Sequence, residues 1–163
     1  EGRRNCRGGV FRAGTGSAMY YLWHAEELGA SPDGRRKGEG LGTNYSASLF
    51  ARNQGPFSIV KSFCKPHLVR TVNGGPLTLE FHSSMFRSAD GVKKLALLVR
   101  SFVESGGHQL QLNTVDAAVL RDAQAHPEKH PQLIVRIWGW SAYFVELDKR
   151  YQDHVIARNE YRL

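Results

Sequence analysis

The chain has 163 residues, of which 41% are hydrophobic and 23% are charged, and its formal net charge is +7 at pH 7. This size and composition are typical of one domain or of a piece of a larger one. Such a chain can bury about 70% of its unfolded surface, which argues against disorder of the whole chain. No apolar run approaches the roughly 20 residues that cross a bilayer, so a membrane-spanning protein is excluded as well.

Residues 1–55 form a glycine-rich region with one predicted helix. The run at 19–28 has helical length and composition, and it is followed by Gly29, a residue suited to ending a helix. Residues 30–55 are polar and glycine-rich. A loop of this length in a compact domain is usually functional, so we expect it to contact other parts of a larger molecule.

Residues 56–163 alternate between predicted strands and helices. Apolar residues alternate along 77–82, as in a half-buried strand, and recur at helical spacing along 91–104. In chain order, the predicted elements are strands at 57–60 and 77–82, a helix at 91–104, a strand at 108–113, a helix at 116–125, a strand at 133–138, a β-favouring segment at 140–147 and a helix at 148–158. This alternation is typical of the α/β class.

The strand predicted at 108–113 has one polar face. Its two leucines point one way, and Gln109, Gln111 and Asn113 share the opposite side. Buried amides need hydrogen-bond partners. We therefore expect this face to pack against another part of a larger protein, which also allows the hypothesis that the chain is a structural fragment.

Gly139 lies between two indoles, Trp138 and Trp140, directly after an apolar strand. A glycine at such a point marks either a sharp turn or a backbone position that another group must approach closely. The local sequence leaves both interpretations open.

The neighbours of this glycine resemble the C-terminal motif of glycyl radical enzymes, the superfamily of pyruvate formate-lyase. That motif is Arg-Val-x-Gly-Tyr/Phe-Ser, and residues 136–141 are Arg-Ile-Trp-Gly-Trp-Ser, with Ile137 in place of valine and Trp140 in place of the other aromatics. Further segments resemble the same region of the family in the same order, at 16–21, 30–35, 106–113 and 120–124. The resemblance thus covers essentially all of residues 1–163.

The resemblance implies the C-terminal part of a ten-stranded α/β barrel, with a loop at 136–141 that carries a radical on Gly139. An α-carbon radical is shared with its flanking amides only when the centre is planar, and glycine has no Cβ to crowd the planar form. Arg136 is expected to hold the loop by hydrogen bonds to carbonyls, and Ser141 to cap the turn. The indoles on either side of the glycine either exclude water and oxygen or are ordinary core residues.

In the family, an activating enzyme with an iron–sulfur cluster and S-adenosylmethionine installs the radical, so no bound cofactor is expected here. The radical then passes to a cysteine, whose thiyl form attacks the substrate. Cys6 and Cys64 do not lie in segments that match this cysteine, and we interpret both as ordinary thiols. The chain is therefore expected to need a missing N-terminal portion or a parent enzyme, a homodimer in its full form.

The sequence starts at Glu1 without an initiator methionine. A truncated sequence, a subunit of a split enzyme and a stand-alone spare part that repairs an oxygen-cleaved parent all fit the resemblance, and truncation is favoured. Segments at 73–78, 138–141 and 143–148 look most like arylacetate decarboxylases and the fumarate-adding succinate synthases. They predict cleavage or formation of a C–C bond, such as arylacetate decarboxylation.

Other functional classes have weaker support. A basic nucleic-acid-binding module would rest on the net charge and on Arg7-Gly8-Gly9, but no basic strand studded with aromatics is present. His126 and His130 are four residues apart, yet prolines interrupt their segment and no third ligand has suitable spacing, so no metal site is expected. Two unpaired cysteines and the absence of a signal peptide favour the cytoplasm.

Overall fold

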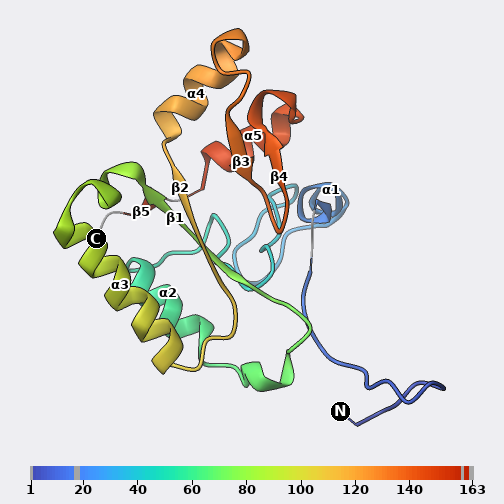
Figure 1. Cartoon of the computed structure of the whole chain (residues 1–163). Helices are drawn as coiled ribbons and strands as arrows, with labels where there is room; N and C mark the ends of the chain where they lie inside the picture. The colour runs from blue at the N-terminus through green and yellow to red at the C-terminus, as the bar shows by residue number, and fades with distance from the viewer. Residues whose placement is uncertain (1, 17–18, 159, 162–163) are drawn as a thin grey trace.

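The computed structural model describes residues 2–16, 19–158 and 160–161. An N-terminal arm extends away from the body of the molecule and folds back on itself through a bridge between Arg4 and Val10 (Figure 1). The arm rejoins the body where the amide of Thr15 donates a hydrogen bond to the carbonyl of Gly74. The described residues after the arm pack around two hydrophobic cores.

A three-stranded parallel sheet lies at the centre, in the order β2-β1-β5. Its strands are β1 (Leu77–His82), β2 (Leu110–Val115) and β5 (Glu160–Tyr161). Helix α3 (Ala89–Glu104) makes the crossover from β1 to β2 that a parallel pair requires. The strand predicted at 77–82 and the helix predicted at 91–104 are both present, and α3 starts earlier because the Ser88 hydroxyl accepts a hydrogen bond from the amide of Gly91.

Helix α2 (Pro56–Phe63) corrects one prediction, because residues 57–60 were expected to form a strand. Pro56 occupies the first turn of the helix, where its missing N–H costs nothing. Ile59, Val60 and Phe63 then point into the first core at helical spacing. The apolar segment at 57–60 is too short for its residues to distinguish the period of a helix from that of a strand.

The first core lies between the sheet and the helices α2 and α3. The side chains of β1 that enter it are almost completely buried. Its buried members are Ile59, Val60, Phe63, Leu68, Leu77, Leu79, Phe81, Met85, Leu98 and Phe102.

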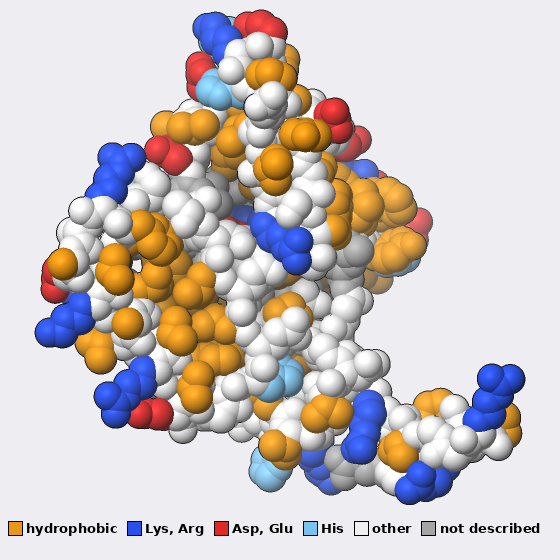
Figure 2. Space-filling model, viewed as in Figure 1, with side chains coloured by type: hydrophobic (Ala, Val, Ile, Leu, Met, Phe, Trp, Pro, Cys, Tyr) orange, Lys and Arg blue, Asp and Glu red, His pale blue; other side chains and the backbone are white. Residues whose placement is uncertain are grey.

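One side of α3 remains uncovered. Val92, Ala96, Val99 and Val103 follow one another at helical spacing and are exposed. Figure 2 shows apolar side chains gathered over this part of the molecule. We call these four residues the α3 strip.

The second core joins α1 (Tyr20–Glu27), α4 (Ala117–Ala125) and α5 (Lys149–Ile156) to the antiparallel hairpin of β3 (Ile134–Arg136) and β4 (Ser141–Tyr143). The helices expected at 19–28, 116–125 and 148–158 are thus present with slightly shorter bounds. Short 3-10 turns lie at Leu68–Arg70, Ser83–Arg87, Pro127–Lys129 and Phe144–Glu146. None of the helices in the described ranges is long and apolar enough to cross a membrane.

The segment at 30–55 contains neither helix nor strand. Arg35 organises its first part, because the buried guanidinium donates hydrogen bonds to the carbonyls of Gly29, Arg36 and Glu39. A single cation that satisfies several carbonyls lets an irregular segment lie against the core without unpaired backbone groups.

Candidate functional site

The hairpin of β3 and β4 presents Gly139 at its tip. Arg136 pairs with Ser141, and the amide of Ile137 donates to the carbonyl of Trp140 at 2.9 Å, so the chain reverses over Trp138 and Gly139. Gly139 is exposed and has a φ of +76°, in the left-handed region where other residues are strained. A Cβ atom built there would meet nothing within 4 Å. The backbone angle, and not a lack of space, therefore requires glycine.

Two buried side chains anchor the hairpin immediately before this tip. Ile137 is fully buried in the second core, and Trp138 is nearly so. The Trp138 ring lies edge-on to Tyr21 of α1, with 6.3 Å between the ring centroids. Trp140, on the other side of the glycine, packs partly buried against the same core. Both indoles thus pack with the second core, and the α-carbon of Gly139 between them remains open.

Arg158, which follows α5, binds the backbone of the same hairpin. Its Nη1 donates to the carbonyl of Arg136 at 3.0 Å, and its Nη2 donates to the carbonyl of Ile137 at 3.3 Å. Its guanidinium carbon lies 5.0 Å from the centroid of the Trp138 ring. Nη1 also forms an ion pair with Glu80 of β1 at 3.0 Å. One side chain therefore connects the glycine hairpin to the central sheet.

Arg136 reaches across the hairpin to the residue that follows the turn. Its exposed guanidinium donates to the hydroxyl of Ser141 across the hairpin at 3.2 Å. This contact joins the two residues of the motif that flank the turn. Arg158 makes hydrogen bonds to carbonyls of the hairpin, and the sequence does not single it out because burial of one arginine at the end of a helix leaves no sequence pattern.

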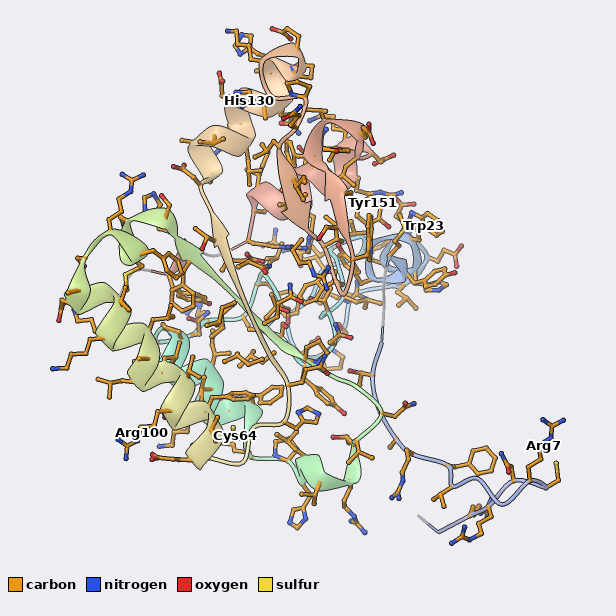
Figure 3. The ribbon with its side chains drawn as sticks, in the orientation of Figure 1. Arg7, Trp23, Cys64, Arg100, His130 and Tyr151 are labelled. Carbon is orange, nitrogen blue, oxygen red and sulfur yellow. The ribbon has the colours of Figure 1, made fainter. Side chains whose placement is uncertain are left out.

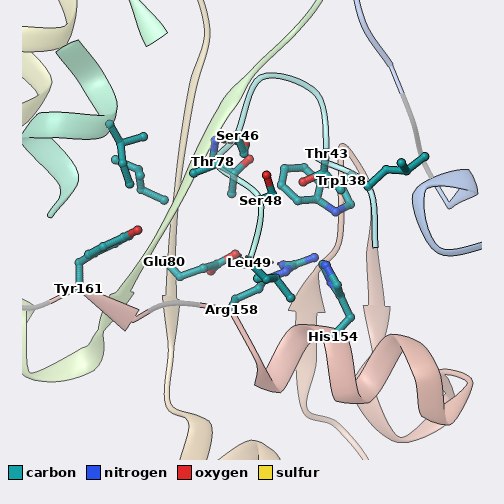
Figure 4. Close-up of a pocket in the computed structure, with 14 residues that line it drawn as sticks. Thr43, Ser46, Ser48, Leu49, Thr78, Glu80, Trp138, His154, Arg158 and Tyr161 are labelled. Atoms are coloured by element: carbon teal, nitrogen blue, oxygen red, sulfur yellow. Dashed lines mark hydrogen bonds and ion pairs between the residues drawn. The ribbon is translucent and has the colours of Figure 1, made fainter. Parts of the chain in front are cut away.

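A small cavity of about 50 Å³ lies beside Trp138 and the ion pair (Figure 4). His154 of α5 lines it, and the ring nitrogen Nδ1 of this histidine is 3.5 Å from the Tyr21 hydroxyl. Burial, together with the nearby Arg158 cation, lowers the pKa of His154 to about 3. The histidine is thus neutral at pH 7, and the only charges buried at this place are the paired ones of Glu80 and Arg158 within the described residues.

Two of the side chains predicted to share the polar face of the strand at 108–113 connect to Glu80. The strand lies at 110–115, two residues later than predicted, because the register pairs Leu77 with Leu110. The amide of Gln111 donates to Asn113 at 2.9 Å, and the amide of Asn113 donates to Glu80 at 3.1 Å. These two amides find partners within the chain.

Neither cysteine lies near the hairpin. Cys6 is exposed on the N-terminal arm. Cys64 caps the end of α2 and packs against the first core, whereas the hairpin belongs to the second, and Figure 3 shows Cys64 far from Tyr151 of α5. Burial raises the pKa of the Cys64 thiol, which disfavours the reactive thiolate.

The histidines four residues apart share one carboxylate. His126 and His130 contact the two oxygens of Asp122, at 3.1 and 2.6 Å. Within the ranges that the structure describes, no group of three or more histidine, cysteine or acidic side chains could hold a metal ion.

Comparison with known proteins places the hairpin within a matched region. The family model described as "Glycine radical" matches residues 42–145. Indoleacetate decarboxylase of Tractidigestivibacter scatoligenes is 40% identical over 141 residues, which cover 85% of this chain and 16% of that enzyme. Trans-4-hydroxy-L-proline dehydratase of Clostridioides difficile is 32% identical over 159 residues, covering 98% of this chain and 20% of the dehydratase.

Solved structures agree with the sequence relatives. The B12-independent glycerol dehydratase of Clostridium butyricum superimposes with a TM-score of 0.92 at 35% identity, over 99% of this chain and 20% of that enzyme. This match over nearly the whole chain confirms the expected α/β fold class. The chain spans about a fifth or less of the length of the relatives it matches.

Proposed function

The chain belongs to the glycine radical family, and on that premise we propose that Gly139 is the residue that stores the radical. Its fold is that of the C-terminal part of glycyl radical enzymes, as the sequence resemblance implied. The observation that carries the proposal is the place of Gly139 in the motif at 136–141, within the residues that the family model matches. There it is an exposed glycine with positive φ at the tip of a hairpin whose preceding residues, Ile137 and Trp138, are buried.

The geometry of the tip suits hydrogen-atom removal. A radical S-adenosylmethionine activating enzyme would break one C–H bond of Gly139 and take the hydrogen atom with one electron, which leaves the unpaired electron on Cα. No Cβ has to move when that centre becomes planar. The exposed tip lets the activating enzyme reach Cα, and the buried Ile137 and Trp138 hold the preceding backbone in place.

The stored radical would take a hydrogen atom from the S–H group of a cysteine outside this chain, because Cys64 packs against the first core, the glycine hairpin belongs to the second, and Cys6 is exposed on the N-terminal arm. The chain would thus act with a larger parent enzyme, a homodimer in its full form. Trp138 and Trp140 would anchor the turn to the second core on either side of the radical, and the contact between Arg136 and Ser141 would close the base of the turn.

For the reaction, we favour decarboxylation of an arylacetate. The 40% identity to an indoleacetate decarboxylase supports it. Dehydration of a hydroxylated substrate is the second candidate, favoured by the superposition on a glycerol dehydratase over 99% of the chain.

The test uses the 163-residue chain and an activating enzyme from a decarboxylase relative, mixed with S-adenosylmethionine under anaerobic conditions. We expect an electron paramagnetic resonance doublet, because the single hydrogen left on Cα splits the signal. Chain labelled with α-deuterated glycine should give a collapsed line. Gly139→Ala should abolish the signal.

Gly106→Ala is the matched control, since Gly106 has a φ of +80° and open space for a Cβ, like Gly139. Each alanine costs about 1–2 kcal/mol of backbone strain, so the two variants should be equally destabilised. A doublet that persists in Gly139→Ala, or one that disappears equally in both variants, would contradict the assignment.

A further inference from the structure

We infer that Arg158 is a positioning residue for the glycine hairpin and that Glu80 orients its guanidinium, an inference that rests on the proposed function of Gly139. In Figure 4, Arg158 lies between the carboxylate of Glu80 and the indole of Trp138. Three elements thus meet at one guanidinium, namely the central strand β1, the end of α5 and the hairpin.

The contacts of Arg158 fall on the residues that lead into the tip. The carbonyls of Arg136 and Ile137 belong to the two residues before Trp138, and both accept hydrogen bonds from the guanidinium. The cation also lies over the ring of Trp138, whose carbonyl carbon forms the peptide bond to Gly139. Arg158 therefore restrains the direction in which the chain enters the turn.

The other end of the restraint is rigid. Glu80 lies on the central strand of the parallel sheet, and its Oε1 accepts from both Arg158 and Asn113. Gln111 in turn donates to Asn113. Because hydrogen bonds from β2 hold the carboxylate of Glu80 on the central strand, the carboxylate sets the orientation of the Arg158 guanidinium.

A stability role explains this arrangement poorly. The side chains of Glu80 and Arg158 are each only 6% exposed. A buried ion pair often contributes little net stability, because the cost of removing two charges from water offsets their attraction. What such a pair does provide is one defined geometry, since the planar guanidinium offers several donors at fixed angles.

That geometry matters for a radical on Gly139. The unpaired electron is delocalised fully only when the two amide planes that flank Cα are coplanar. With φ at +76° the two planes are not coplanar in this structure, so one of them has to turn about Cα when the radical forms. Restraint on residues 136–138 leaves the tip itself free of contacts and keeps the incoming plane fixed.

The test measures amide hydrogen exchange, which needs no radical. The reporter is the amide of Ile137, which donates to the carbonyl of Trp140. In Arg158→Lys, a point charge can still pair with Glu80 but cannot also bind two carbonyls in a fork. We expect exchange at Ile137 to rise by about tenfold or more, with α3 exchange unchanged. Arg150→Lys is the control, because Arg150 lies on α5, the helix that precedes Arg158, and pairs with Glu26 at the surface.

Unchanged exchange at Ile137 in Arg158→Lys overturns the inference. Exchange that rises equally at Ile137 and in α3 also overturns it, because it indicates loss of global stability alone. A double variant, Glu80→Leu with Arg158→Met, removes both buried charges together. If the double variant has the melting temperature of the parent chain, we still expect faster hydrogen exchange at the amide of Ile137. Exchange at Ile137 as slow as in the parent chain refutes the positioning role.

The spectroscopic measurement separates this inference from the proposed function. If the parent chain gives a doublet, Arg158→Lys should give a broadened one, from a wider distribution of backbone angles, while Arg150→Lys should not. A parent chain that forms no radical refutes the function of Gly139 and leaves the exchange result to decide whether Arg158 fixes the hairpin. A sharp, unaltered doublet in Arg158→Lys counts against the inference.

Discussion

His154 is a buried group whose protonation would place a second cation beside Arg158. Its pKa is about 3 in the folded protein because of burial and of that guanidinium, against 6.5 when unfolded. The facing Tyr21 hydroxyl also stays neutral, because burial raises its pKa. The folded state therefore resists protonation of the histidine, and the unfolded state does not.

We predict that stability is fully present above pH 6.5 and declines as the pH falls from 6.5 towards 3. The slope approaches about 1.4 kcal/mol per pH unit, because the unfolded state binds one more proton. Urea unfolding between pH 7 and pH 4.5 measures it. His154→Gln should flatten the slope in this range, and an unchanged slope would show that another group is responsible. Hydrogen bonds lower the pKa values of the Asp122 and Asp153 carboxylates from 3.8, so the stability that depends on their charge is lost mainly below the pH range of this measurement.

Among single residues, Gly139 could be predicted from the sequence, whereas the contacts of Glu80 and Arg158 that hold its hairpin could not. A glycine between two indoles in a family motif could be recognised from neighbouring residues. Glu80 and Arg158 are separated by 78 positions, and nothing local indicates that one carboxylate and one guanidinium become buried together. Pairing of that kind depends on the strand β1 and the end of α5 meeting in space.

Among the elements, α4 depends on a cap that can be tested directly. The Asp116 carboxylate accepts hydrogen bonds from the amides of Ala118 and Val119, at 3.0 and 3.4 Å. Asp116→Ala should lower the free energy of unfolding by about 1 kcal/mol, and Asp116→Asn by much less, because asparagine also caps helices well. Denaturant unfolding of the two variants checks this. Equal losses would mean that the charge of Asp116, and not its cap, stabilises the helix.

The elements also show where periodicity succeeds and fails. Helix α3 has sixteen residues, long enough for its apolar spacing to be unambiguous. The eight residues of α2 contain an apolar segment too short to separate helix from strand, although Pro56 at its first turn was a usable signal. The strand β2 was found but misplaced, because its start is set by pairing with β1 and not by its own sequence.

For the whole molecule, the α3 strip is an apolar surface of one helix that the described residues leave exposed. Exposed apolar patches promote association. We predict that the 163-residue chain binds a hydrophobic dye and self-associates, and that Val99→Lys with Val103→Lys reduces both. Dye fluorescence and light scattering measure the change.

Val69→Lys is the control for this prediction, because Val69 is also exposed but lies outside the strip. Surface changes of this kind usually alter stability by no more than about 0.5 kcal/mol, so the melting temperatures should stay close together. Equal effects from Val69→Lys would mean that added charge alone, and not loss of the strip, prevents association.

The hairpin has a further consequence for the integrity of the polypeptide. On one side of Gly139, β3 continues back into the second core, and on the other side β4 and α5 are held there by strand pairing and by Tyr151 and Val155. A break in the backbone at the tip would therefore give two pieces that stay bound to each other through strand pairing and core packing. Such damage would pass unnoticed in a native gel and appear as a shorter band only after the protein is boiled in detergent.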